Sequence, residues 1–333
     1  MNEPRLPPGV RAIDRLMKAN KSFSVEHMDE RALQRAQTQV IPDAGLGALV
    51  AGIFVGRPRA GVTIATSSFP ASHGDVPLRI YTPDAPAGPR PVVVNFHGGG
   101  FALGSSRQGD WICSHVAADL DAVVVSVDYR LAPTHRFPAA VEDCYDALVW
   151  TAGHADELGG DPERLGLMGD SAGGNLAAVV AIMAREAGGP RVLHQALIYP
   201  ATDLTEGLRE HESYVGNTRG IVLSNADMEI FRSFYLSETD DPSDWRLSPL
   251  HATDLSGLPP AVVVVAGLDP LHDAGVRYAE ALVAAGVHAR VEDFHVMPHG
   301  FLSFPHFSRH ARPALAAIVA SQREALGAPS VSR

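Results

Sequence analysis

The sequence is poor in cysteine, in surplus positive charge and in long apolar runs near its start. Its two cysteines, Cys113 and Cys144, give no disulfide framework and fall in segments of helical character, so we interpret them as buried packing residues. With 27 Lys and Arg against 38 Asp and Glu, the formal net charge is -11, which argues against a nucleic-acid partner. Because residues 1–20 mix charges with prolines, neither a signal peptide nor stable membrane anchoring is expected, and the predicted location is cytoplasmic.

Apolar runs alternate with helical patterns along most of the 333 residues. This alternation is typical of an α/β fold with a mostly parallel central sheet flanked by helices. Hydrophobic residues make up 46% of the sequence, which is ample for a large core. The predicted strands cover residues 78–81, 92–96, 122–128, 164–168, 192–199, 261–265 and 289–294, and the predicted helices cover 111–120, 137–154 and 176–183.

One pentapeptide, Gly169–Gly173, has the form G-x-S-x-G. It lies between an apolar run that predicts a strand and an Ala-rich run that predicts a helix. A serine hydroxyl is a poor nucleophile in water, so an enzyme that uses one exposes it on a sharp turn beside a general base and amide donors. Ser171 is therefore a candidate nucleophile, provided that the chain also supplies its partners.

A glycine-rich loop, Gly98–Gly100, closely follows the predicted strand at 92–96. Backbone N–H groups of such a loop, together with one from the residue after the nucleophile, stabilise the negative oxygen of a tetrahedral intermediate. Ala172 would supply that second kind of donor. The alternative is a phosphate-binding or merely tight turn, but a dinucleotide fingerprint does not fit, because Ala102 and Leu103 stand where the third glycine should fall.

Asp269 follows the predicted strand at 261–265 and precedes Pro270, a residue suited to the first turn of a helix. After a strand–turn–helix nucleophile, the acid and then the base are expected on loops that follow later strands. Asp269 could also be a simple helix N-cap. Asp273 competes for the role of acid, but we expect it inside the helix that Pro270 begins, pointing away from the strand edge.

The sequence holds 15 histidines, so only position can single out a catalytic base. His97 belongs to the glycine loop, and His295, at a predicted strand end, is interpreted as packed or solvated. His306 and His310 have a spacing that could bind a metal, but no acidic or cysteine ligand accompanies them, so a surface helix face is the simpler interpretation. His299, in a loop next to glycine, is the preferred base.

Together these features resemble the hormone-sensitive-lipase family of α/β-hydrolase esterases, also called the bacterial type IV carboxylesterases. The resemblance covers residues 75–325. Its motifs are the H-G-G-G loop at 97–100, the Y-R-L-A-P segment at 129–133, the G-D-S-A-G-G elbow at 169–174, the D-P-L-x-D segment at 269–273 and the His-Gly pair at 299–300. Thr134 stands where the family has glutamate, a departure that touches none of the residues assigned to chemistry.

The expected activity is that of a serine carboxylesterase, for which the resemblance implies short- to medium-chain esters, and no cofactor or metal is expected. In this mechanism His299 removes the proton of Ser171, while Asp269 orients the imidazole and stabilises its cationic form. The expected oxyanion donors are Gly99, Gly100 and Ala172, with Gly98 shaping their loop. An amidase or deacetylase with the same triad is the alternative. A non-catalytic ligand-binding protein is less favoured, because such relatives have typically lost the histidine.

Residues 204–248 interrupt the alternation of strands and helices, and carry many charges and an aromatic helical segment at 228–235. We interpret them as a cap inserted over the active site, the alternative being a solvated surface excursion. The resemblance implies that residues 1–50 join this cap through helices at 13–19 and 28–39. The expected organisation is 1–50 N-terminal cap helices, 51–203 first part of the hydrolase core, 204–248 cap insertion and 249–333 second part of the core.

The expected partner is a small-molecule ester. Relatives in the family often pair through the last strand, which implies a homodimer through residues 289–294. The charges of Arg290, Glu292 and Asp293 can also discourage such edge pairing.

Overall fold

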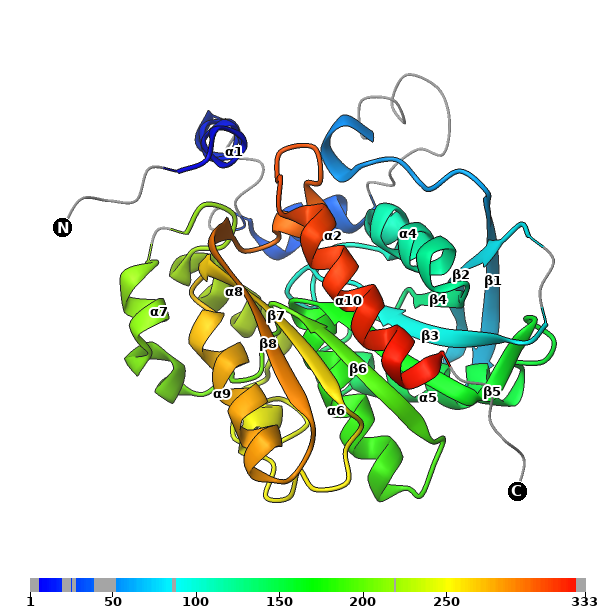
Figure 1. The fold of residues 1–333 in the computed structure, drawn as a ribbon. Coiled ribbons are helices and arrows are strands. Elements are labelled where there is room, and N and C mark those ends of the chain that lie inside the picture. Colours follow the sequence, from blue (N-terminus) through cyan, green and yellow to red (C-terminus); the bar gives the residue numbers. More distant parts are fainter. Residues whose placement is uncertain are drawn as a thin grey trace.

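The computed structural model describes residues 6–19, 25, 28–38, 52–85, 88–218 and 220–327. Its centre is an eight-stranded sheet with helices on both faces (Figure 1). The strands lie in the order β1-β2-β4-β3-β5-β6-β7-β8. They are β1 (Val62–Ala71), β2 (Gly74–Pro83), β3 (Arg90–Phe96), β4 (Val123–Val127), β5 (Gly160–Asp170), β6 (Val192–Ile198), β7 (Ala261–Leu268) and β8 (Ala289–Pro298).

Only the first strands of the sheet run antiparallel. β1 pairs with β2, and β2 pairs with β4, in antiparallel register, whereas all neighbours from β4 to β8 are parallel. This arrangement confirms the predicted α/β class with a mostly parallel sheet. The sequence does not predict β1, because six of its ten side chains are exposed, only one is buried, and the apolar alternation that marks a strand is weak there.

Two layers of helices bury the sheet. The helices are α1 (Pro8–Ala19), α2 (Glu30–Gln37), α4 (Asp110–Leu120), α5 (Ala139–Gly153), α6 (Ala172–Glu186), α7 (Glu212–Gly216), α8 (Asn225–Tyr235), α9 (His272–Ala284) and α10 (Ala311–Leu326). Because successive side chains of a strand point to opposite faces, Val92 and Val94 of β3 belong to the apolar cluster under α5, α6 and α9, and Val93 belongs to the cluster under α4 and α10 (Figure 1). Cys113 and Cys144 are free and buried, in α4 and α5.

The segment at 204–248 contains the 3₁₀ helix η4 (Glu206–Glu210), then α7 and α8. α8 starts at a capping box, in which the Ser224 hydroxyl accepts the Asp227 N–H and the Asp227 carboxylate accepts the Ser224 N–H. Of the predicted N-terminal helices, 13–19 lies within α1 and 28–39 overlaps α2, although residue 39 lies outside the described residues.

Three local predictions are wrong in detail. β8 continues to Pro298 rather than ending at residue 294, because its pairing with β7 resumes at Pro298, opposite Leu268, after a shift in register. α9 begins at His272 rather than at Pro270, because residues 269–271 form a turn that Asp269 caps. His306 and His310 precede α10, so they do not form a helix face.

Among the helices of the described ranges, none combines the length and hydrophobicity needed to cross a bilayer.

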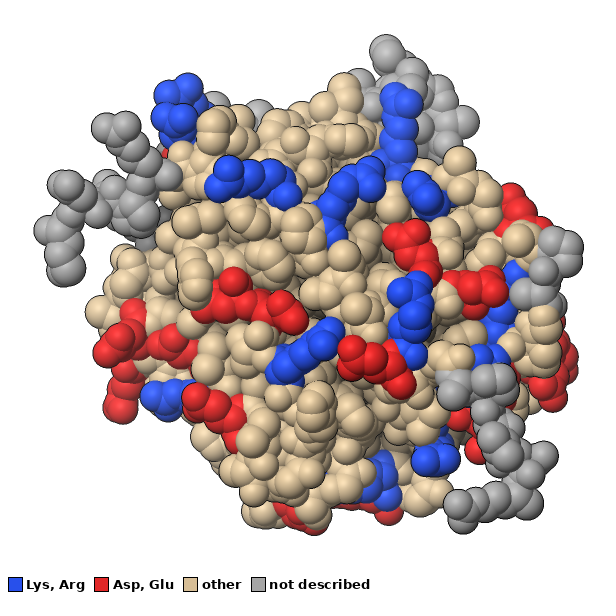
Figure 2. Space-filling view, viewed as in Figure 1, with Lys and Arg blue, Asp and Glu red and all other residues tan. Residues whose placement is uncertain are grey.

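On the face that carries α4 and α10, basic side chains gather across the upper part of the view, and acidic side chains lie mostly below them, where the two kinds are mixed (Figure 2).

Candidate active site

Ser171 stands at the sharp turn between β5 and α6. Its φ of 55° lies in the left-handed region, where a side chain is strained. A Cβ at Gly169 would lie 2.1 Å from the carbonyl oxygen of Gly173, and one at Gly173 would lie 2.0 Å from that of Phe96. Both positions therefore require glycine, because the turn brings the backbones of β3, β5 and α6 into contact. Ser171 is thereby held at the pocket that it lines.

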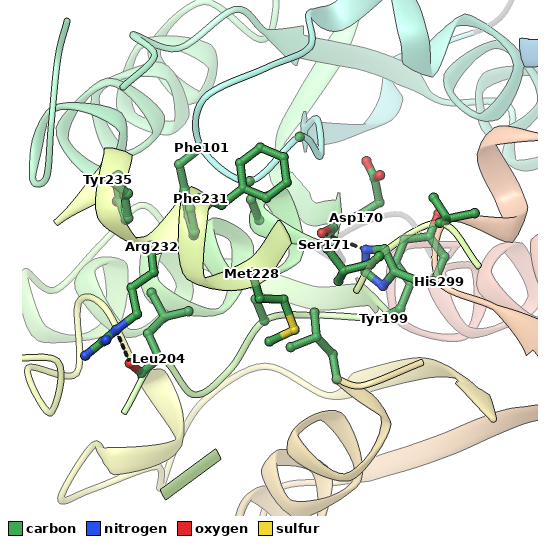
Figure 3. Close-up of a pocket in the computed structure, with 18 of the residues that line it drawn as sticks. Phe101, Asp170, Ser171, Tyr199, Leu204, Met228, Phe231, Arg232, Tyr235 and His299 are labelled. Carbon is green, nitrogen blue, oxygen red and sulfur yellow. Dashed lines mark hydrogen bonds between the residues drawn. The ribbon is translucent and has the colours of Figure 1, made fainter. Parts of the chain in front are cut away.

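His299 reaches Ser171 from the loop that directly follows β8. Its Nε2 lies 2.9 Å from the hydroxyl oxygen of Ser171 (Figure 3), and its Nδ1 lies 2.7 Å from Oδ2 of Asp269. Asp269 is fully buried directly after β7, and its Oδ1 accepts the N–H of Leu271 at 2.8 Å. Because both carboxylate oxygens are engaged, the acid is held in one orientation and orients the imidazole in turn.

Asp273, the rival acid, bonds elsewhere. Its Oδ2 accepts the backbone N–H of Ser213 at 2.9 Å, and its Oδ1 lies 2.9 Å from Nδ1 of His272. The Ser213 hydroxyl also donates to the carbonyl oxygen of Pro270 at 3.1 Å. Asp273 thus ties α7 of the 204–248 segment to the turn that carries Asp269.

The glycine loop has a backbone that other residues could not adopt easily. Gly99 and Gly100 have φ values of 120° and 61°, in the region that disfavours side chains. A Cβ on Gly99 would lie 2.1 Å from the carbonyl oxygen of Leu103, and one on Gly100 would lie 2.2 Å from the ring of Phe231. The loop therefore packs between its own next turn and α8. Ala172 opens α6, where the first backbone N–H groups have no partner within the helix.

Gly98 takes a different part from its two neighbours. Its N–H donates to Oδ1 of Asp170 at 2.9 Å, so this group holds the loop instead of facing a ligand. The adjacent His97 is buried, stacks on Tyr129 with 4.3 Å between ring centroids, and has a pKa lowered by burial. Both contacts anchor the start of the loop.

Two polar residues beside the triad were not singled out from the sequence. Asp170 lines the pocket, and desolvation raises its pKa to about 6, against the opposing effect of the Gly98 N–H. Tyr199 follows β6, and its ring centroid lies 4.8 Å from that of His299. Asp170 is the variable position of G-x-S-x-G, and Tyr199 ends a predicted strand, so position on the sheet edge was the available signal.

The triad opens into an apolar cavity of about 310 Å³ (Figure 3). Its walls come from the glycine loop, the turn after β6 and the 204–248 segment. They include Phe101, Leu208, Tyr214, Leu223, Met228 and Phe231. Charged side chains of η4 and α8 also line it, although nothing in their sequence pattern distinguishes them from solvated surface charges. Thr134 is exposed and lies outside the lining.

Within the described residues, no group of three or more His, Cys, Asp or Glu is arranged to hold a metal ion. The site geometry instead provides a hydroxyl, an imidazole and a carboxylate in one hydrogen-bonded chain beside a glycine loop. This set can perform nucleophilic acyl transfer with general base assistance.

Comparisons with known proteins point in the same direction. A family model described as alpha/beta hydrolase fold matches residues 93–303. The carboxylic ester hydrolase LipN of Mycobacterium tuberculosis (strain ATCC 25618 / H37Rv) is 41% identical over 297 residues, which cover 86% of this chain and 75% of the relative. The ethyl acetate hydrolase of Pseudomonas putida is 36% identical, over 75% of this chain and 79% of its own. The hyperthermophilic esterase from the archaeon Pyrobaculum calidifontis is 38% identical with a TM-score of 0.85, covering 96% of this chain and 98% of the esterase.

Proposed function

The chain belongs to the α/β-hydrolase fold family, among the hormone-sensitive-lipase carboxylesterases, and we propose that it cleaves esters with Ser171, His299 and Asp269 as its catalytic residues. The predictions of a carboxylic ester hydrolase and of its family are confirmed by these matches. The proposed roles rest on one observation, the unbroken hydrogen-bond chain from the Ser171 hydroxyl through the imidazole to a buried carboxylate.

In the proposed reaction, Oγ of Ser171 attacks the ester carbonyl carbon while Nε2 of His299 takes the hydroxyl proton. The tetrahedral intermediate collapses when the imidazolium gives this proton to the leaving alcohol oxygen, which leaves an acyl-enzyme. A water then attacks the acyl carbon, with His299 again taking and returning a proton, and the carboxylic acid departs. Asp269 stabilises the imidazolium at both stages.

We propose that Gly99, Gly100 and Ala172 donate N–H bonds to the oxyanion, with Gly98 shaping the loop. The positive φ values of the two loop glycines support this proposal, because they let bare backbone face the cavity. The contact of the Gly98 N–H with Asp170 supports the separate role of Gly98.

We further propose short- to medium-chain acyl esters as substrates. The cavity of about 310 Å³ lies at the lower end of the range of ligand pockets, and its apolar walls suit hydrocarbon chains. The name of the Pseudomonas relative, an ethyl acetate hydrolase, fits a small ester. Amide cleavage stays an alternative, which relative rates on matched ester and amide substrates would decide.

We propose that residues 204–248 are the cap, since η4, α7 and α8 supply much of the cavity wall. An N-terminal contribution from residues 1–50 is supported by Gln37 of α2. Its side-chain amide donates to the carbonyl oxygens of Ala102 and Ala132 at 2.7 and 2.8 Å, close to the glycine loop. A homodimer through β8, which forms an edge of the sheet, and a cytoplasmic location both stay predictions.

The decisive experiment replaces the nucleophile. Ser171→Ala is expected to abolish hydrolysis of p-nitrophenyl butyrate and labelling by a fluorophosphonate probe, while its circular dichroism stays that of the wild type. Ser233→Ala, which changes an exposed serine outside the cavity lining, serves as the matched control and should retain both. Turnover near the wild-type level in Ser171→Ala would remove this residue as the nucleophile.

A further inference from the structure

The apolar cavity extends from Ser171 to the side opposite His299. In Figure 3, Met228 and Phe231 of α8 lie on one side of Ser171 and His299 lies on the other, with Arg232 farther out. The imidazole must hand its proton to the leaving alcohol oxygen, so the alcohol belongs on the side of His299. The acyl chain is then directed toward α8 and the cap.

This part of the cavity has its own apolar cluster, which meets the larger core of the sheet at Phe231. Leu208, Tyr214 and Leu223 of the cap pack there with Leu271, which follows Asp269 in the acid turn by two residues. Met228 and Phe231 complete the cluster from α8. Apolar side chains from both the cap and the core thus provide a continuous surface for a hydrocarbon chain.

Four charged side chains also line this part of the cavity, and the one labelled in Figure 3, Arg232, lies farther from Ser171 than Met228 and Phe231 do. We call them the charge ring: Glu206 and Arg209 of η4, and Glu229 and Arg232 of α8, all of which line the cavity. Arg209 pairs with Glu206, and lies 2.9 Å from Glu229. Arg232 lies 3.0 Å from Glu206 and 3.8 Å from Glu229. Each arginine therefore contacts both carboxylates, and the ring joins η4 to α8.

Further hydrogen bonds connect the charge ring to the cavity wall. The Tyr214 hydroxyl donates to Oε1 of Glu229 at 3.2 Å, and Nε of Arg232 donates to the carbonyl oxygen of Leu204 at 3.1 Å. Tyr214 also belongs to the apolar cluster, so its ring forms part of the cavity wall while its hydroxyl bonds the charge ring. The ring consequently ties the turn after β6, η4, α7 and α8 together.

We infer that the charge ring is the specificity-determining end wall of the acyl pocket, and that it sets the longest acyl chain the enzyme accepts. A chain that ends within the apolar cluster is buried favourably. A longer chain must either press methylene groups against ionised side chains and strip them of water, or separate η4 from α8. Both cost free energy, so the ring discriminates by length. This inference rests on the proposed esterase function and assigns its acyl selectivity to residues that take no part in the chemistry.

The test compares kcat/KM for p-nitrophenyl decanoate and p-nitrophenyl butyrate, each below its micellar concentration. Arg209→Ala removes two of the ring's four pairs and should raise the decanoate-to-butyrate ratio about fivefold, the scale expected for exposed pairs acting as a network. Arg209→Lys keeps the charge and should keep a ratio near that of the wild type. A ratio is independent of the fraction of enzyme that is active, so partial unfolding cannot imitate the effect.

The matched control is Arg246→Ala. Arg246 pairs with Asp244 in the cap segment, its side chain is 45% exposed against 48% for Arg209, and it lies outside the cavity lining. Its removal should leave the ratio unchanged. High salt provides a second readout, because screening should raise the ratio of the wild type, with four pairs, by more than that of Arg209→Ala, which keeps only the two pairs of Arg232.

An unchanged ratio in Arg209→Ala, or an equal rise in Arg246→Ala, would overturn the inference. Failure of the proposed function is distinguishable, since it would appear as turnover that survives Ser171→Ala, whatever the chain-length ratio.

Discussion

Two carboxylates beside the same cavity, Asp269 in the proposed catalytic turn and Glu229 in the proposed cap, accept hydrogen bonds in very different surroundings. Asp269 is fully buried, with one oxygen on His299 and the other on the Leu271 N–H. The Glu229 side chain is 40% exposed and shares its two arginine partners with Glu206. Buried charges are strongly coupled to their partners, whereas exposed pairs contribute little each. The region around Asp269 and His299 is therefore rigidly preorganised, whereas the 204–248 segment is held by contacts that solvent and substrate can loosen.

The comparison predicts its largest effect at the buried carboxylate. Asp269→Asn should lower kcat for p-nitrophenyl butyrate by about 10⁴-fold, because the amide favours the wrong imidazole tautomer and cannot stabilise the imidazolium. Asp273→Asn should lower it by less than about tenfold, since Asp273 contacts α7 and His272 instead of the base. Measurement of kcat for both variants checks this ranking, and the reverse order would overturn the choice of acid.

Asp170, next to Ser171, provides a second test of this region, because its protonation makes folding stability depend on pH. Its pKa is raised from 3.8 to about 6, mainly by desolvation. Between these values the folded state binds more protons than the unfolded state, so folding stability falls as the pH rises through this window. The loss reaches up to about 3 kcal/mol above the higher pKa.

In Asp170→Asn, whose amide oxygen can still accept the Gly98 N–H, that loss should disappear. Urea unfolding of the wild type and the variant at pH 4.5 and pH 7 is the measurement. We expect the variant to gain stability relative to the wild type at pH 7 and to differ less at pH 4.5. Parallel pH dependences of the two proteins would refute the assignment.

The boundary between the two regions lies at Gly100, where the glycine loop meets Phe231 of the cap. Gly100→Ala should lower kcat/KM by roughly tenfold to a hundredfold, because the added Cβ meets the ring and strains a positive φ. Adding Phe231→Ala should restore part of the loss by removing the clash while the backbone strain stays. Gly153→Ala is the control, since a Cβ there meets nothing within 4 Å. If kcat/KM of the double variant stayed as low as that of Gly100→Ala, the contact between the glycine loop and Phe231 would not explain the loss.

The same contrast explains how far the sequence could be interpreted. Ser171, Asp269 and His299 each follow a strand directly, and the C-terminal ends of parallel strands share one edge, so motif and periodicity together predict their meeting. The charge ring could not be predicted in this way, because its members come from two elements whose packing is tertiary and whose charges are typical of a solvated surface. The prediction of a helix face for His306 and His310 was wrong for a related reason, since a separation of four residues does not by itself produce a helix.

The smallest predicted effect lies at the contact that attaches the cap to the catalytic turn. The Ser213 hydroxyl bonds the Pro270 carbonyl and receives the Asp273 N–H, both at 3.1 Å. Ser213→Ala should therefore lower the free energy of unfolding by about 1 kcal/mol, the net worth of such bonds. KM should rise by about two- to threefold with kcat nearly constant, because a looser cap weakens binding without disturbing the buried triad. If kcat fell instead while KM stayed the same, the cap would be part of the rigid catalytic region, and the distinction between the two regions would fail at this contact.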